Sequence, residues 1–141
     1  MIRRSALVLC LALFAAACGN DTPDTPTPPQ GPATLQIEDL TVGTGAEASG
    51  GKLLTMNYAV YLYDPAGSGG RGTGIQQSSF TFRQGANAVI PGVEQGMNGM
   101  KEGGIRRLTI PPSLAYGAQG SGNIPGNSWI VFDCQLVTVA D

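Results

Sequence analysis

Tyr116 is the side chain best placed to do chemistry, because it stands between two small residues in a turn that follows Pro111 and Pro112. An apolar alternation over residues 105–110 precedes these prolines. A strand should therefore end at the prolines and present the phenol beyond its end. A tyrosine in such a turn is poorly placed to serve only as core, so we favour a functional role for Tyr116.

The rest of the composition excludes most other catalytic chemistry. The chain has no histidine, which removes the usual base of nucleophilic triads and the commonest zinc ligand. Of its three cysteines only Cys134 lies in the body of the domain, where it fits a small buried apolar residue and cannot form a thiolate metal cluster. The carboxylate pairs Glu38 with Asp39 and Glu94 with Glu102 are best explained as surface or helix-flank charges. We expect no metal and no cofactor.

One reaction that needs no acid, base or nucleophile is rotation about the amide bond that precedes proline. Its barrier is about 18–20 kcal/mol, because the C–N bond has partial double-bond character. A site that binds the twisted, less polar amide better than the planar one lowers this barrier, and each ~1.4 kcal/mol of preference gives a tenfold rate increase. The requirements are a proline-sized apolar pocket and one or two donors for the flanking carbonyls.

Three sequence blocks, in order, resemble the FKBP family of peptidyl-prolyl isomerases. They are VIPGVEQGM at residues 89–97, GGIRRLTIPPSLAYG at residues 103–117, and IP followed by IVFD at residues 124–125 and 130–133. The resemblance covers about residues 34–141. It implies an α+β fold, in which a twisted antiparallel sheet of four to six strands wraps around one short helix. It also implies cis-trans isomerisation of Xaa-Pro bonds in proline-containing polypeptides.

The resemblance also implies the site residues, motif by motif. The implied catalytic residues are Tyr58, Ile90, Tyr116 and Phe132. The implied substrate-binding residues are Ile75, Gln76, Phe80, Val89, Val93 and Ile124. In the family, the backbone N–H at the position of Ile90 and the hydroxyl at the position of Tyr116 bind substrate carbonyls. Val89, Ile90 and Phe132 would also fit a plain core role.

Three positions depart from the family pattern. Most active members carry Phe-Asp before a serine pair, where this chain has Ile75 and Gln76, and a tryptophan or leucine at the pocket floor, where it has Val93. The resemblance then implies a wider, less polar pocket, weaker catalysis and weaker binding of macrolide inhibitors. A non-catalytic proline-binding or chaperone module stays open as an alternative, and a structural lipoprotein without a ligand as a third.

The local patterns predict the elements that position these residues. Period-two alternation indicates strands over residues 35–40, 53–62 and 129–139. Strands are also predicted over residues 105–110, before the two prolines, and over the short stretch 80–82. Val93, Met97 and Met100 recur at helical spacing behind Pro91, which predicts one short helix. The glycine-rich residues 65–74 predict a mobile, exposed loop. These elements also indicate an α+β domain.

The N-terminus is typical of an exported lipoprotein. Residues 1–17 fit a signal peptide, with Arg3 and Arg4 before an apolar stretch too short to span a bilayer. Cys18 follows three alanines, which resembles a bacterial lipobox, although Ala15 stands where leucine is usual. We expect lipidation of Cys18 and a membrane partner through the lipid anchor. A plain signal peptide with Cys18 as a free thiol is the alternative.

Residues 18–33, rich in proline and threonine, predict a tether that holds the domain of residues 34–141 on the order of 40 Å from Cys18. Loss of residues 1–17 removes two of the eight basic residues, so six basic and ten acidic side chains remain, a net charge of −4. We therefore expect no nucleic-acid partner. We expect a monomer in the cell envelope, and Gly19 after Cys18 favours the outer membrane, facing the periplasm, in a Gram-negative host.

Overall fold

The computed structural model describes residues 26–141, so the predicted signal peptide, the lipidation of Cys18 and the first part of the tether lie outside the described residues. The described part contains five strands, one α-helix and two short 3₁₀ turns. In chain order these are β1 (Gln36–Thr41), β2 (Leu53–Tyr63), a 3₁₀ turn (Ser68–Gly70), β3 (Arg71–Arg83), α1 (Pro91–Met97), β4 (Ile105–Ile110), a 3₁₀ turn (Pro112–Leu114) and β5 (Ile130–Ala140).

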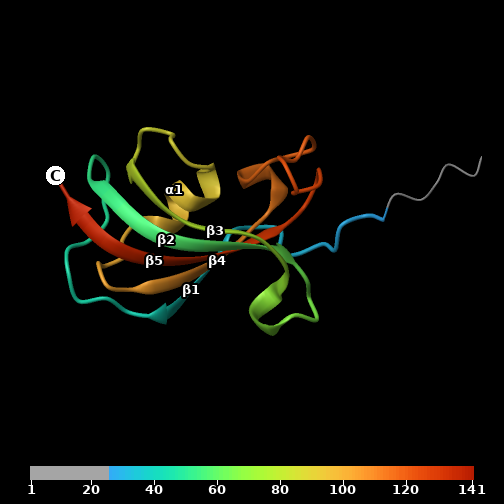
Figure 1. The fold of residues 1–141 in the computed structure, drawn as a ribbon, viewed down its shortest axis with the longest axis horizontal. Coiled ribbons are helices and arrows are strands. Elements are labelled where there is room, and N and C mark those ends of the chain that lie inside the picture. Colours follow the sequence, from blue (N-terminus) through green and yellow to red (C-terminus); the bar gives the residue numbers. More distant parts are fainter. Residues whose placement is uncertain (1–25) are drawn as a thin grey trace, which may run out of the picture.

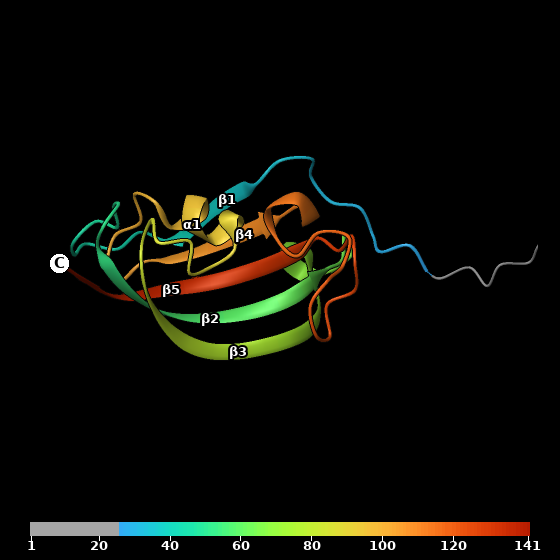
Figure 2. The ribbon, with the colours of Figure 1, turned by 90° about the horizontal axis from the view of Figure 1, so that it is seen from above.

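The five strands form one antiparallel sheet in the order β1-β4-β5-β2-β3. The sheet is strongly curved, and α1 lies on one of its faces (Figures 1 and 2). This arrangement confirms the predicted fold class: an antiparallel sheet of four to six strands around one short helix. The long central strands β2 and β5 run side by side from Leu53↔Ala140 to Leu62↔Ile130.

The core lies between the helix and the concave face of the sheet. Alternate residues of the central strands point into it, as the period-two patterns predicted. The fully buried side chains that these strands and the helix contribute to this core are Leu54, Met56, Val93, Met97, Leu108, Ile110, Ile130, Cys134 and Leu136. Cys134 is a free thiol whose burial raises its pKa to about 12, so it serves as an apolar residue here.

Two glycines let α1 lie directly on β4. A Cβ atom on Gly92 would come within 2.4 Å of Ile110, and one on Gly96 within 2.5 Å of Leu108. Pro91 occupies the first turn of the helix, where the missing N–H costs no helical hydrogen bond. The close approach fixes the start of α1, and with it Val89 and Ile90, against the sheet.

Arg106 ties the C-terminal end of α1 to two strands. Its side chain is nearly buried, and Nη1 donates hydrogen bonds to the carbonyl oxygens of Gly96 at 2.8 Å and Asn98 at 3.2 Å. Its Nε and Nη2 atoms donate to the two carboxylate oxygens of Asp39 on β1, at 2.6 and 3.1 Å. These contacts satisfy carbonyls that the end of a helix leaves without intrahelical partners.

The loop predicted over residues 65–74 is shorter than expected. The 3₁₀ turn occupies Ser68–Gly70, and β3 begins at Arg71 and runs to Arg83. The strand is therefore much longer than the short strand predicted over residues 80–82. Arg71 anchors this start, because its side chain donates to the carbonyl oxygen of Ser68 at 3.1 Å and to the carboxylate of Asp133 at 3.3 Å. The prediction of a loop was therefore wrong from Arg71 onward, where β3 begins.

The predicted tether also differs from the structure at its C-terminal end. Pro28, Gly31 and Pro32 are half-buried, and the indole N–H of Trp129 donates a hydrogen bond to the carbonyl oxygen of Pro32 at 2.9 Å. This end of the segment is thus packed on the domain rather than free of it. None of the helices within residues 26–141 is long and apolar enough to cross a membrane.

Candidate active site

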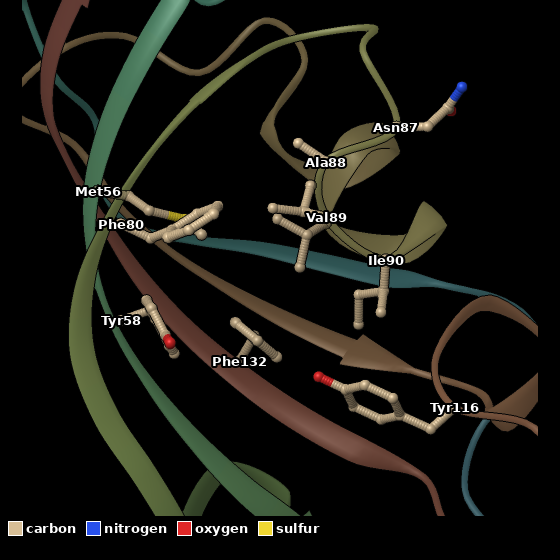
Figure 3. Close-up of a pocket in the computed structure, with 10 residues that line it drawn as sticks. Met56, Tyr58, Phe80, Asn87, Ala88, Val89, Ile90, Tyr116 and Phe132 are labelled. Carbon is tan, nitrogen blue, oxygen red and sulfur yellow. The ribbon is translucent and has the colours of Figure 1, made fainter. Parts of the chain in front are cut away.

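A cavity of about 390 Å³ opens between the start of α1 and the curved sheet (Figure 3). Its lining comes from five parts of the chain: β2, β3, β5, the segment that leads into and begins α1, and the turn after Pro111 and Pro112. The lining residues are Met56, Tyr58, Phe80, Asn87, Ala88, Val89, Ile90, Val93, Tyr116 and Phe132. Eight of these ten side chains are large apolar or aromatic groups, so the pocket suits a small apolar ligand group.

Tyr116 reaches the pocket from the turn that the prolines create. The 3₁₀ turn Pro112–Leu114 follows β4, and the N–H of Gly117 closes the turn on the carbonyl oxygen of Pro112 at 2.9 Å. The Tyr116 hydroxyl points into the cavity toward Phe132 (Figure 3) and takes part in no hydrogen bond among the described residues. Burial, and secondarily the nearby Tyr58, raise the pKa of Tyr116 above its ordinary value. It is therefore a neutral donor with no protein acceptor.

Ile90 places a second donor at the edge of the pocket. It is the extended residue just before α1, with φ −60° and ψ 150°, and its carbonyl oxygen accepts the first helical hydrogen bonds from Val93 and Glu94. Among the hydrogen bonds of residues 26–141, none uses the Ile90 N–H as donor. This N–H and the Tyr116 hydroxyl are two donors without a protein acceptor that an extended ligand could find here.

Tyr58 and Phe132 form the wall supplied by the central strands. Their rings are stacked with centroids 5.4 Å apart and an angle of 23° between the planes. The Tyr58 hydroxyl accepts a hydrogen bond from Nε2 of Gln76 at 2.8 Å. Two contacts thus fix the Tyr58 ring, which narrows the range of ligand positions that the pocket accepts.

The structure brings together seven of the ten residues assigned from the sequence. These pocket-lining residues are Tyr58, Phe80, Val89, Ile90, Val93, Tyr116 and Phe132. The other three lie beside the cavity: Ile75 is half-buried against the core, Gln76 contacts the Tyr58 hydroxyl, and Ile124 is buried at 7% exposure. Of the three departures from the family pattern, only Val93 changes the lining itself.

Sequence reasoning missed Met56, Asn87 and Ala88 as lining residues. Met56 carried a usable signal, because it alternates with Tyr58 on the inward face of β2. Ala88 directly precedes Val89 on the same approach to α1. Asn87 has a φ of 54°, a left-handed turn conformation that asparagine tolerates, and its side chain points away from the cavity (Figure 3).

The electrostatics of the pocket suit a neutral ligand. No carboxylate, lysine or arginine lines it, and within residues 26–141 no three histidine, cysteine, aspartate or glutamate side chains gather as a metal-ion site would need. A proline ring in the apolar part of the cavity would leave its flanking carbonyls within reach of donors at the rim. Such a site can favour a twisted amide over a planar one without transferring a proton.

Comparison with known proteins agrees with this geometry. Residues 45–137 match the family of FKBP-type peptidyl-prolyl cis-trans isomerases. The chain is 42% identical over 113 residues to the peptidyl-prolyl cis-trans isomerase FKBP15-3 of Arabidopsis thaliana, covering 74% of this chain and 73% of that protein. It is 39% identical over 107 residues to the FK506-binding protein of Neisseria meningitidis serogroup A, covering 75% and 96%.

Solved structures give the same result. The crystal structure of FkpA from Escherichia coli superposes with a TM-score of 0.64 at 32% identity, over 75% of this chain and 48% of that one. The crystal structure of AtFKBP13 superposes with a TM-score of 0.64 at 33% identity, over 75% of this chain and 93% of that one. Together with the pocket, these matches show that the chain belongs to the FKBP-type peptidyl-prolyl cis-trans isomerases.

Proposed function

We propose that the protein catalyses cis-trans isomerisation of Xaa-Pro bonds in exported proteins and does so by binding the twisted amide in the Tyr116 pocket. The observation that carries the proposal is the pair of free donors, the Ile90 N–H and the Tyr116 hydroxyl, at an apolar cavity of about 390 Å³. Phe132 and Val93 receive the proline ring in the depth of the pocket. The donors hold the carbonyls on either side of the amide bond that rotates.

The proposed mechanism needs no proton transfer. As the amide twists, conjugation is lost and the carbonyl and nitrogen become less charge-separated, which lowers the cost of leaving water for an apolar wall. Stacking with Phe132 and the hydrogen bond from Gln76 keep Tyr58 in place as part of that wall. The pocket thus favours the transition state over either planar isomer.

We further propose weaker binding of macrolide inhibitors than in relatives with a larger residue at the pocket floor. Val93 is only 1% exposed and lines the cavity, so a shorter side chain at this position leaves space that a rigid ligand does not fill. Ile75 and Gln76 lie outside the lining and contribute less to this difference.

The experiment that tests the function compares three proteins of residues 26–141 in the isomerisation of short Xaa-Pro peptides: the unchanged chain, Tyr116→Phe, and Tyr61→Phe as control. Tyr61 lies outside the pocket, stacked under Arg71. Loss of one hydrogen bond in the transition state should lower kcat/KM of Tyr116→Phe about tenfold, and the control should match the unchanged chain. Equal rates for both variants would exclude the role of Tyr116. Absence of acceleration by the folded, unchanged chain would favour the non-catalytic binding module.

The proposed location is the cell envelope, with the chain held by lipid on Cys18. The support is the sequence alone: a short apolar stretch, three alanines and then Cys18, followed by Gly19, which favours the outer membrane in a Gram-negative host. Metabolic labelling with a fatty acid should mark the chain and not its Cys18→Ala variant. A chain that is exported but unlabelled would indicate a plain signal peptide instead.

A further inference from the structure

A second groove lies where the chain enters the domain, and it shares no lining residue with the Tyr116 pocket. We call the face formed by the end of β2 and the segment before β5 the Trp129 groove, and a cavity of about 210 Å³ lies between this face and the proline-rich segment. Its walls on the domain side are Leu62, Tyr63, Pro125, Ser128 and Trp129. The remaining wall consists of residues 26–29 of the proline-rich segment. Figure 2 shows this segment, in blue, passing close to the loop that precedes β5.

Two contacts tie the proline-rich segment to Trp129. The indole N–H donates to the carbonyl oxygen of Pro32 at 2.9 Å, across 97 positions of sequence. Gly31 lies against the rings, because a Cβ atom there would stand 2.7 Å from Cδ1 of Trp129 and 3.2 Å from Cε1 of Tyr63. Any larger residue at position 31 would have to displace the aromatic pair or leave the groove.

The chemistry of the segment matches the chemistry of the groove. Its four prolines have fixed φ angles and no N–H groups, which favours an extended polyproline II segment whose carbonyls remain available as acceptors. Aromatic grooves with a tryptophan N–H that donates to such a carbonyl are a recurring way to bind these segments. We propose that the Trp129 groove is a recognition site for a proline-rich extended segment and that its ligand is the chain's own residues 26–32.

Because residues 26–32 belong to the same chain as the groove, their high local concentration favours binding. A ligand held by a short connection has a local concentration in the millimolar range, so even a weak groove is occupied by it. Docking of residues 26–32 also shortens the tether. Where Cys18 is lipidated, as proposed above, only residues 19–25 remain between the anchor and the domain, and they span at most about 25 Å. The isomerase then works close to the membrane surface.

The first test uses the full chain in detergent with Gly31→Val. Trp129 is the only tryptophan, so intrinsic fluorescence reports on the groove alone. The variant should shift the emission of Trp129 to longer wavelength and increase its quenching by acrylamide. Gly50→Val is the matched control, because no atom lies within 4 Å of a Cβ at that exposed position. Identical emission and quenching in the two variants would overturn the proposal.

A second test separates recognition from simple contact. A peptide of residues 25–33, TPTPPQGPA, is added to the full-length Gly31→Val chain. It should protect Trp129 from quenching in a saturable way at millimolar concentration, and a peptide in which the prolines are alanines should not. Failure of the peptide to protect Trp129 at up to about 10 mM would overturn the recognition site, even with an emission shift in the first test. Neither readout depends on isomerase activity, so this outcome leaves the proposed function untouched.

Discussion

The side-chain amide of Gln76 donates a hydrogen bond of 2.8 Å to the hydroxyl oxygen of Tyr58. The family resemblance places a carboxylate at this position, and a carboxylate can only accept a hydrogen bond from a tyrosine. The Gln76 amide instead donates to the Tyr58 hydroxyl. The Tyr58 hydroxyl therefore keeps a hydrogen-bond partner although position 76 carries no charge. Because its oxygen is the acceptor, its own proton is free to point toward a ligand.

Gln76→Leu should remove this contact and loosen the Tyr58 ring. Because the pair is exposed, the lost hydrogen bond is worth about 0.5–1.5 kcal/mol, and kcat/KM for Xaa-Pro peptides should fall between about twofold and tenfold. Gln77→Leu is the matched control, since Gln77 is the next residue on β3 and therefore points to the opposite face. Equal kinetics of the two variants would show that Gln76 does not position Tyr58.

The pH dependence of isomerisation should be flat over the neutral range. Tyrosines are the only ionisable side chains in the pocket lining, and burial raises the pKa of Tyr116 above its ordinary value. We expect kcat/KM to stay constant from about pH 6 to about pH 9. The raised pKa also contributes to stability below the ordinary tyrosine value, and this contribution is lost as the pH rises through the folded pKa. A bell-shaped profile centred near neutrality would contradict the proposed mechanism.

Gly96→Ala should push α1 away from β4. The added Cβ would lie 2.5 Å from the side chain of Leu108, which is itself fully buried. Overpacking of this kind costs about 1–3 kcal/mol, measured as a lower urea midpoint with an unchanged m-value. Gly50→Ala should have little effect, because its Cβ would meet open space. An unaltered midpoint for Gly96→Ala would mean that the helix can shift freely on the sheet.

Arg106→Met should be among the most destabilising single changes on β4. It leaves the carbonyl oxygen of Gly96 and the carboxylate of Asp39 without their donor, which should cost about 2–4 kcal/mol in urea unfolding. Arg83→Met serves as control, because Arg83 is exposed on the edge strand β3. A similar small decrease in the free energy of unfolding of both variants would show that the Arg106 contacts contribute little to stability.

The same variant should change the response to acid. The hydrogen bond from Arg106 lowers the pKa of Asp39 below its ordinary value. A carboxyl whose folded pKa is lowered contributes stability above its unfolded pKa and loses it as the pH falls through the folded value. The unchanged chain should therefore lose stability below about pH 4 more steeply than Arg106→Met. If the free energy of unfolding of the two proteins fell equally with decreasing pH, Arg106 would not be the cause of the lowered pKa of Asp39.

The sequence by itself determined those features that rest on local patterns. Strand patterns defined β2, β4 and β5, and Pro91 with the helical spacing of Val93 and Met97 defined the start of α1. The helix ends at Met97, so Met100, which the same spacing had included, lies outside it. Hydrophobic periodicity and proline geometry act over a few residues, which is why they can be read without knowledge of the fold. The turn that presents Tyr116 was predictable for the same reason.

Only the tertiary structure decided which residues of β3 reach the site. Residues 76–79 are polar and show no alternation, because β3 is an edge strand with little burial to impose one. Val60 pairs with Gln76 and Tyr61 with Gly74, so Ile75 is an extra residue in the strand. Such a bulge takes Ile75 out of the regular alternation of the strand. Gln76 stays in register with Phe80 on the same face and meets the site only through the Tyr58 hydroxyl.

Whether the proline-rich segment packs on the domain also depended on the fold. Composition alone indicates a free tether, since such a segment cannot build a core of its own. Its packing on the domain depends on Trp129, which lies 97 positions from Pro32 in sequence. The indole reaches Pro32 only because β5 begins next to the end of β2. Contacts between distant segments are set by the path of the whole chain, and no local pattern contains them.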